Sequence, residues 1–482
     1  MSFENELRNL FDEADTEVSL DDGSLTAVKM RAKQRTNRAR MAVGAAAIAL
    51  IAFGGVLVSN IQREAANVEL TDIPDDGSEG ALEDEAEDTS ESGVDGTVEG
   101  SDTGPVSEDD FSYAGAFLVP SSEVAIEGVE RFDFGGSASA FNPFGDPDNT
   151  DGFAGSIFMT GFPRNAQVAE ISIPEPAPHD GTTAGLPIAE MLQPFSDVTD
   201  GRADTFVGSE EVGGQGEFRI GGLEVLDGPG GQRLHWTAWQ WQDVGVHDNP
   251  GHGHSSLDLS NPDPQGPWFL GDFEGYESAG YVFSVPENFA NAELGGRELI
   301  AGFQDVEATF SSMSQGPPFF AFSPFEQAEP ETRLAEPLEL ASYGDGDLVT
   351  NFSDTAATPG ATWVSTSDGR SAVVTVGNDV LAPGDLSCSP GETQPVEGFG
   401  PRFTFYDPAD LAAVASGERD SNQVEPYRVW DPTEHLIAFC GLQISSISFD
   451  ADAGRIYVVQ TRADVSQGEF GFLPVVHVFD VG

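Results

Sequence analysis

Apolar and polar residues alternate in short runs through most of the chain, from Phe111 to Gly482. Alternation with a period of two is typical of β-strands that bury one face. Many of these runs end at a proline, which cannot continue a central strand. The runs with this ending are VAEISIP at Pro174, GYVFSVP at Pro286, FFAFSP at Pro324 and FTFYDP at Pro408. The pattern predicts an all-β domain.

Two further kinds of run complete a repeating unit. First strands followed by a polar turn occur at 138–143, 360–369 and 445–454, and second strands at 156–162, 233–242, 298–303, 372–377 and 455–461. Strand, turn, strand, loop, strand is the order within one blade of a β-propeller, and about five such units are present. YAGAFLVP at 113–120 would add the outer strand of the last blade. A pair of β-sandwiches is the alternative fold.

One short helix interrupts this all-β pattern. The sequence DPADLAAVASG predicts a helix over Ala409–Ser416, with Asp407 as its N-cap and Gly417 as its stop.

A different pattern occupies the N-terminal part, where residues 41–58 form a long apolar run without charge. As a helix it would be about 27 Å long, close to the thickness of the hydrocarbon core of a bilayer. It follows a basic patch made of Lys29, Arg31, Lys33, Arg35, Arg38 and Arg40. Positive charge stays on the cytoplasmic side, so we predict a transmembrane helix at 41–60, a cytoplasmic stub at 1–40 and an extracytoplasmic C-terminal part. A cleaved signal peptide is the alternative.

Residues 61–110 lack the features of a folded segment. From Ala66 to Asp110 there is no aromatic and no basic residue, while Gly, Ser, Asp and Glu dominate. Such a segment buries too little apolar surface to offset its ordering entropy. It predicts a disordered acidic linker between the membrane helix and a domain at 111–482.

The charge of the chain restricts its partners. There are 21 Lys and Arg against 82 Asp and Glu, a formal net charge of −61, and no lysine follows Lys33. Such a surface repels phosphate backbones, which excludes nucleic acid, and it repels anionic lipid headgroups. The expected counter-ions are salt cations, Ca²⁺ or a basic protein. An acidic surface adapted to salty surroundings explains the same composition.

The two cysteines, Cys388 and Cys440, both lie on the predicted outer side. In that compartment an even pair predicts one disulfide, which in the chain-entropy model stabilises by roughly 4 kcal/mol. A thiol nucleophile or metal ligand is the alternative, but neither cysteine sits in a CxxC pair or beside a histidine.

Several phrases in the C-terminal part also resemble those of a known family. YAGAFLVP, VAEISIP, SSLDLSNPDPQGPWFLG, FYDPADLAAVASG and GRIYVVQ with VVHVFDV are similar to an uncharacterised family of secreted bacterial proteins. The resemblance covers about 112–482 and implies propeller-like architecture, without an established activity or catalytic residue. The stub, basic patch and anchor resemble actinobacterial single-pass membrane proteins, some anti-sigma factors among them.

Histidines concentrate in one segment, and four of the seven are His235, His247, His252 and His254. In VHDNPGHGHSS a Gly-rich loop would bring His247, Asp248, His252 and His254 around one divalent ion, with Zn²⁺ the favoured candidate. The spacing matches no established metal motif, and ordinary turn composition explains it equally.

Trp239 and Trp241 share one strand face with His235 and Thr237, while Trp236 points the other way. A row of indoles predicts a platform for a sugar ligand, and filling between neighbouring blades is the alternative.

Acidic loops at 145–152 and 343–350 offer oxygen ligands for Ca²⁺, although neither fits a loop motif fully. No nucleophile elbow, P-loop, HExxH or dinucleotide motif occurs in a convincing context.

The function that these patterns favour is non-catalytic: a membrane-anchored propeller that binds a carbohydrate, a small molecule or a basic protein outside the cell. An extracytoplasmic hydrolase of polysaccharide or phosphoester, with or without an assisting metal, is the first alternative. A transmembrane sensor that signals through the stub is the second.

Overall fold

The computed structural model divides the chain into two units, Met1–Ser101 and Asp102–Gly482. The structure describes residues 104–121, 131–145, 155–162, 167–203, 218–228, 230–240, 249–273, 275–304, 316–324, 330, 332–334, 337–344, 356–380, 399–438, 443–467 and 472–482. No helix in these ranges is long and apolar enough to cross a membrane. The predicted stub at 1–40 and span at 41–60 lie outside them.

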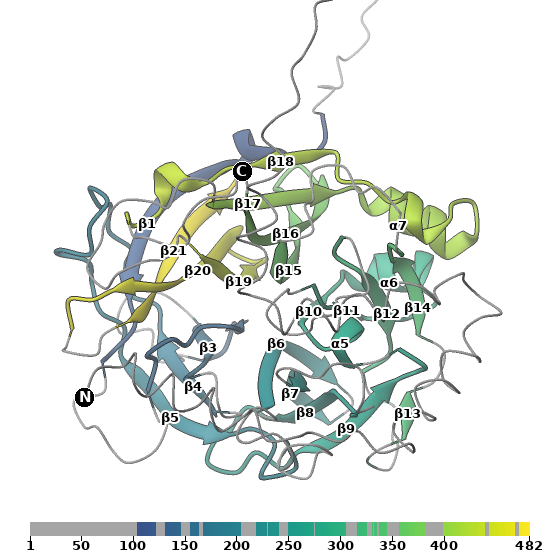
Figure 1. The fold of residues 1–482 in the computed structure, drawn as a ribbon, viewed down its shortest axis with the longest axis horizontal. Coiled ribbons are helices and arrows are strands. Elements are labelled where there is room, and N and C mark those ends of the chain that lie inside the picture. The colour runs from purple at the N-terminus through teal and green to yellow at the C-terminus, as the bar shows by residue number, and fades with distance from the viewer. Residues whose placement is uncertain are drawn as a thin grey trace, which may run out of the picture. The chain divides into compact units, whose positions relative to one another are not determined.

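Five antiparallel sheets succeed one another around a common axis (Figure 1). Blade 1 contains β2 (Ser139–Asn142), β3 (Ser156–Thr160), β4 (Gln167–Ser172) and β5 (Met191–Asp197). Blade 2 contains β6 (Phe218–Gly228), β7 (Gly231–Gln240), β8 (His252–Ser256) and β9 (Gln265–Leu270), to which β13 (Arg333–Leu334) pairs in parallel. Blade 3 contains β10 (Tyr281–Ser284), β11 (Leu299–Gly302), β12 (Phe319–Phe322) and β14 (Leu338–Ala341).

Blade 4 contains β15 (Ala357–Ser365), β16 (Ser371–Val380), β17 (Phe399–Tyr406) and β18 (Arg428–Trp430). Blade 5 contains β19 (Ile444–Asp450), β20 (Arg455–Asp464), β21 (Leu473–Val481) and, as its outermost strand, β1 (Phe111–Leu118). The described helices are η1 (Glu108–Asp110), α5 (Gly275–Ser278), α6 (Glu287–Glu293), α7 (Pro408–Ser416), η3 (Ser421–Gln423) and η4 (Thr433–His435). The domain is therefore a five-bladed β-propeller, and the alternative pair of sandwiches is wrong.

Two local predictions are confirmed. The segment 113–120 does close the ring, since β1 pairs antiparallel with β21 from Phe111 opposite Val481 to Leu118 opposite Val475. The predicted helix is α7, where the Asp407 side chain accepts the Ala409 N–H and Gly417 ends the helix with a φ of 79°.

The assignment of GYVFSVP to the end of a blade is wrong. Residues 281–284 form β10, which is the innermost strand of blade 3. The third strand of blade 2 is instead β8, in the Gly- and His-rich segment predicted as a loop. Proline ends inner and outer strands alike, so it marks the end of a strand without giving its position in the blade.

Residues 104–110, the last part of the predicted disordered linker, are ordered against blade 4. Val106 is fully buried, and its carbonyl accepts the Tyr427 hydroxyl at 2.8 Å. Glu108 pairs with Arg428, and Asp110 pairs with Arg370 at 2.6 Å. Composition could not show this, because the arginines that hold the segment lie more than two hundred residues away in the sequence.

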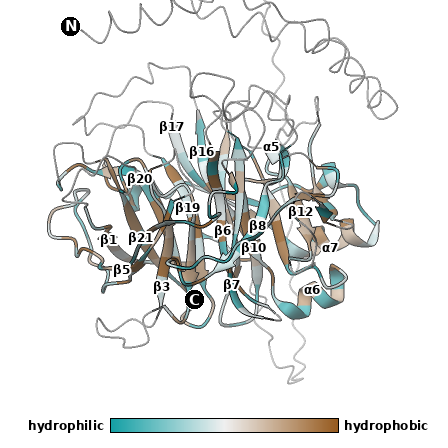
Figure 2. Ribbon diagram, turned by 90° about the horizontal axis from the view of Figure 1, so that it is seen from below, coloured by the Kyte–Doolittle hydropathy of each residue, from teal (hydrophilic) through white to brown (hydrophobic). Residues whose placement is uncertain are grey.

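The hydrophobic core is divided among the joints between blades. Five buried clusters lie one at each joint, and they contain Phe158 with Trp236, Trp268 with Phe320, Tyr281 with Tyr406, Phe403 with Phe479, and Ile171 with Tyr457. In Figure 2 the hydrophobic residues of strands such as β21 are brown, while much of α6 is teal. Each blade is thus stabilised by its two neighbours.

Hydrogen bonds also join every blade to the next near the end at which the inner strands begin. We call this end the top face, defined by Ser139, Phe218, Tyr281, Ala357 and Ile444, and the other end the bottom face. The bonds are Ser137 Oγ to Ile220 O (3.3 Å), Thr237 Oγ1 to Gly280 O, Thr358 Oγ1 to Gln304 Oε1 (2.7 Å), Asn378 Nδ2 to Ile444 O (3.0 Å) and Ser139 Oγ with Ser446 Oγ (2.9 Å). We call this set the polar belt.

Glycine lets the inner strands approach closely enough for these bonds. A Cβ on Gly221 would lie 2.4 Å from the Ala279 carbonyl oxygen, and a Cβ on Gly360 would lie 2.9 Å from the Ser446 Cα. Both contacts are with backbone of the neighbouring blade, which cannot move aside.

Asn378→Ala is expected to lower the free energy of unfolding by about 2 kcal/mol. Asn378 satisfies both backbone groups of buried Ile444, donating to its carbonyl and accepting its N–H at 3.1 Å. Ser139→Ala is the matched control, because Ser446 keeps its bond to the Gly136 carbonyl and little should be lost. Urea denaturation of the variants tests this, and equal losses would contradict it.

Candidate functional site

The predicted metal-binding segment divides between a described strand and residues outside the described ranges. His252 and His254 lie in β8, between β7 and β9, while His247 and Asp248 lie outside those ranges. The loop prediction is therefore wrong for 252–256. Gly253 is needed for β8 to pair with β7 here. It lies opposite Trp236, and a Cβ at this position would be 2.3 Å from the indole. The alternation of His, Gly and His is thus a strand pattern.

The face of blade 2 that points to blade 3 carries four titratable side chains. We call it the histidine face, defined by Glu224 of β6, His235 of β7, and His252 and His254 of β8. Glu224 is opposite His235, and His235 is opposite His254, so these three form one row across the sheet. The rings of His235 and His254 are 5.1 Å apart between centroids.

Blade 3 supplies contacts to both ends of this face. Ser284 at the end of β10 donates its hydroxyl to Glu224 Oε1 at 2.5 Å. Ser278 Oγ lies 3.3 Å from His252 Nε2, and the Phe322 ring packs edge-on against His252 at 5.2 Å. Burial raises the pKa of Glu224 to about 7, while the Ser284 bond acts in the opposite direction.

The three histidines are held neutral. Burial lowers the pKa of His252 to about 3 and keeps that of His235 well below its usual range. Burial, followed by the nearby Arg233 guanidinium, lowers the pKa of His254 to about 4. Arg233 Nε also donates to His254 Nδ1 at 3.1 Å, which fixes this nitrogen as an acceptor. The face therefore presents neutral imidazoles beside a carboxyl that titrates near neutral pH.

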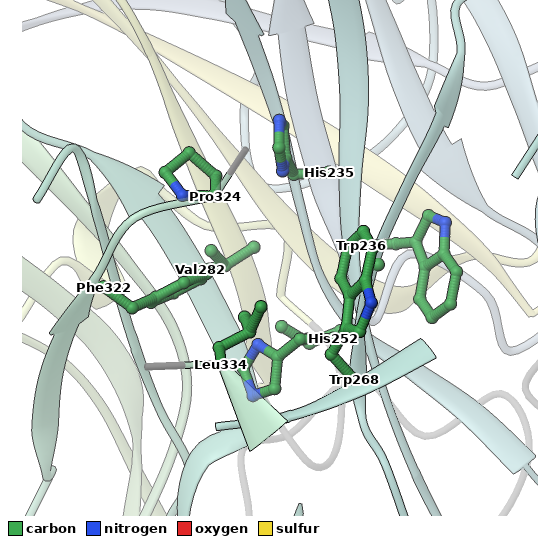
Figure 3. A pocket seen from close by; sticks show the side chains of 10 residues that line it. His235, Trp236, His252, Trp268, Val282, Phe322, Pro324 and Leu334 are labelled. Carbon is green, nitrogen blue, oxygen red and sulfur yellow. The ribbon is translucent and has the colours of Figure 1, made fainter. Parts of the chain in front are cut away.

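A small cavity lies between the histidine face and blade 3 (Figure 3). Its volume is about 10 Å³, enough for roughly one water molecule. It is lined by His235, Trp236, Thr237, His252, Gly253, Trp268, Val282, Phe322, Pro324 and Leu334. Within the described part of the chain, His252 Nδ1 is buried and meets no hydrogen-bond partner. The cavity suits a bound water and is too small for a sugar.

The structure does not bring a complete metal centre together within the described ranges. No group of three or more His, Cys, Asp and Glu side chains there is placed to hold an ion. His254 is engaged by the Arg233 cation, which disfavours a second cation at the same nitrogen. A Zn²⁺ site at His247, Asp248, His252 and His254 stays a prediction, as do Ca²⁺ sites at 145–152 and 343–350, which extend beyond the described residues.

Trp239 lies near the top-face end of β7, and Trp241 lies outside the described ranges. The Trp239 ring is 5.0 Å from the Phe303 ring of blade 3, and the Arg219 guanidinium lies 5.6 Å from its centre. Trp239 is buried, as filling between blades requires. Trp236 points to the opposite side, as predicted, and donates to Ser255 Oγ at 2.9 Å. A ligand-binding role for Trp239 and Trp241 stays a prediction.

Sequence reasoning missed Glu224, Arg233, Ser278 and Ser284. The run GGLEVLDG held a signal that could have identified Glu224, because a carboxyl between Leu223 and Val225 is unusual in a buried strand. Nothing local to the two serines marks them. Cys388 and Cys440 lie outside the described residues, so their disulfide stays a prediction.

No model of a known protein family and no curated protein matches this sequence. Solved structures with a similar chain path include a candidate exo-β-1,3-galactanase of Bifidobacterium bifidum, at 13% identity and a TM-score of 0.36, covering 77% of this chain and 96% of that one. A thermostable family-43 glycoside hydrolase has 9% identity and a TM-score of 0.36, with coverages of 76% and 95%. An α-L-arabinofuranosidase of Fusarium graminearum has 8% identity and a TM-score of 0.35, with coverages of 76% and 97%. Likeness this distant transfers no activity or residue to this chain.

Proposed function

We propose that this propeller is a rigid, non-catalytic binding module whose top face binds a positively charged protein partner. In this proposal the predicted anchor at 41–60 and the linker hold it outside the cell, with the stub inside. Three features support this role: the long top-face connections of blades 2 to 4, the polar belt and the net negative charge.

Connections between second and third strands differ in length around the top face. They run through 241–251 in blade 2, 303–318 in blade 3 and 381–398 in blade 4, against 161–166 in blade 1 and 465–472 in blade 5. On the bottom face, first and second strands are joined through 229–230 in blade 2 and 366–370 in blade 4, but through 143–155 in blade 1 and 285–298 in blade 3. Long connections on a rigid scaffold are where binding residues concentrate. The long top-face connections of three consecutive blades are the observation that supports the proposal most.

Polar groups near the top face are already engaged with one another. Gln304 bonds Thr358, Asn378 bonds Ile444, and Asn249 Nδ2 donates to Gln240 Oε1 at 2.8 Å. Buried polar groups paired in this way rigidify the scaffold that carries the top-face connections.

The negative net charge of the chain favours a positively charged partner. With a formal charge of −61, the chain attracts a basic partner at long range and speeds their association. An uncharged sugar or small molecule would gain nothing from that field.

The experiment measures binding of a lysine-rich peptide to the full chain by calorimetry near physiological salt. Asp305→Asn with Glu307→Gln removes two charges from a top-face connection, and about tenfold weaker binding is expected. Asp227→Asn with Asp452→Asn removes two exposed charges from bottom-face turns and should change little. Equal loss in both variants would indicate unspecific attraction and overturn the proposal.

A glycan hydrolase is the second candidate, and Glu224 is the observation that favours it. A carboxyl on an inner strand with a pKa of about 7 has the property of a general acid at neutral pH. Release of reducing sugar from polysaccharide by the wild type, abolished in Glu224→Gln, would establish this candidate in place of the first. No release by the wild type would remove it.

A further inference from the structure

A second histidine cluster lies against the closing strand, on the opposite side of the fold from the site described above. Tyr113 of β1 stacks on the His435 ring at 4.9 Å and meets the His179 ring edge-on at 5.6 Å. Its hydroxyl lies 3.0 Å from Nδ1 of His477 on β21. The three histidines come from η4, from the connection after β4, and from β21. We call His179, His435, His477 and Tyr113 the closure cluster.

The hydrogen bonds of His477 define its protonation state. Gln460 is fixed by two bonds to Ile437, since its Nε2 donates to the carbonyl and its Oε1 accepts the N–H, each at 2.9 Å. The same Oε1 lies 2.9 Å from His477 Nε2, so Nε2 must donate. Nδ1 is then the acceptor of the Tyr113 hydroxyl. His477 is fully buried, and its pKa is lowered to about 3 by burial and then by His179 and His435.

His179 is tied to the closed arrangement by two hydrogen bonds. Its Nε2 lies 3.0 Å from the His435 carbonyl oxygen, which can only accept. Its Nδ1 accepts the Gly181 N–H at 3.0 Å. These bonds hold the His179 ring edge-on against Tyr113 and beside His477.

Few charges compensate the cluster. Glu434 lies 3.7 Å from His435 Nε2, but its side chain is 77% exposed, and Asp180 beside His179 is exposed too. The remaining neighbours of Tyr113 on β21 and η4 are Phe479 and His435, while Gln460 of β20 is neutral. Burial lowers the pKa of His435 more than Glu434 raises it. The ring centroids of His179 and His477 are 5.7 Å apart. Two imidazolium ions at this distance would repel each other.

We propose that the closure cluster is a pH-sensitive latch, in which acidification releases β1 from β21 and opens the propeller ring at blade 5. With β1 detached, His477 is free to take up a proton. Because the closed form binds that proton poorly, the opening equilibrium constant rises by up to about tenfold per pH unit below pH 6.5. This single histidine gives an increase on the order of tenfold between pH 6.5 and pH 5.

Hydrogen exchange of the full chain, corrected for the intrinsic effect of pH, measures this opening. The amides of Phe111–Leu118 should lose protection on the order of tenfold between pH 6.5 and 5. Amides of Ser156–Thr160 in blade 1 and Ser371–Val380 in blade 4 should keep theirs. Constant protection of β1, or parallel loss in all three segments, would overturn the latch.

Two variants separate the latch from general acid sensitivity. His477→Gln removes the buried titrating imidazole and keeps an amide that can donate and accept, so most of the pH dependence of β1 exchange should disappear. His252→Gln removes a buried histidine from the histidine face and should leave the β1 profile unchanged. Identical profiles in all three proteins would contradict the proposal.

Discussion

Deleting Phe111–Leu118 from the full chain is expected to abolish cooperative unfolding of the propeller. β1 supplies the outer strand of blade 5, and its residues Ala116, Phe117 and Leu118 are buried in two clusters beside blade 1. Burial of Phe117 and Leu118 alone is worth about 5 kcal/mol, and the backbone bonds to β21 add to it. This approaches the whole stability of a typical domain. Loss of a sigmoidal urea transition, followed by near-UV circular dichroism, is the readout.

A deletion of the same length upstream provides the control. Removing Ser90–Thr97 from the predicted linker shortens the chain by as much without touching a described residue. It should leave the urea midpoint unchanged. If both deletions unfold with the wild-type midpoint, β1 is dispensable and blade 5 is stable with three strands.

Glu224→Gln is expected to stabilise the protein at pH 8 by about 3 kcal/mol and to change little at pH 4.5. The pKa of Glu224 is raised to about 7 in the fold, against about 4.3 in an unfolded chain. The protonated carboxyl is therefore favoured by folding, and stability is lost as pH rises from about 4.3 to about 7. Glutamine keeps the oxygen that accepts the Ser284 hydroxyl and carries no charge. Guanidinium denaturation at both pH values measures the difference.

Ser284→Ala should have the opposite effect at the same joint. It removes the hydroxyl that stabilises the ionised carboxylate, so its cost should be larger at pH 8 than at pH 4.5. If Glu224→Gln raised the free energy of unfolding equally at both pH values, the difference in stability between the glutamate and glutamine proteins would come from packing and not from ionisation.

Much of the fold was predictable because propeller strands alternate clearly. Runs such as 156–162 and 455–461 contain enough β-branched and aromatic residues to be identified alone, and the closing role of 113–120 follows from the missing strand of the last blade. Edge strands were missed because they are short and half-exposed. β5, for example, contains Pro194 and has two exposed residues among seven.

The candidate site was predicted only in part. His252 and His254 were identified by density of histidine, but the metal interpretation assumed a loop, and β8 turns their side chains toward blade 3. Glu224 and Ser284 are sixty residues apart and meet only because adjacent inner strands face one another. Their pairing depends on which blade β10 belongs to, the assignment that the proline pattern gave wrongly.

The ordered segment before β1 changes how a pulling force would reach the domain. Tension transmitted from the N-terminal side meets the ion pairs of Glu108 with Arg428 and Asp110 with Arg370 before it reaches Phe111. These pairs therefore act as a mechanical anchor point on blade 4 that shields the ring-closing strand from peeling. Because they are ionic and partly exposed, added salt would weaken the anchor point and lower the force needed to unzip β1.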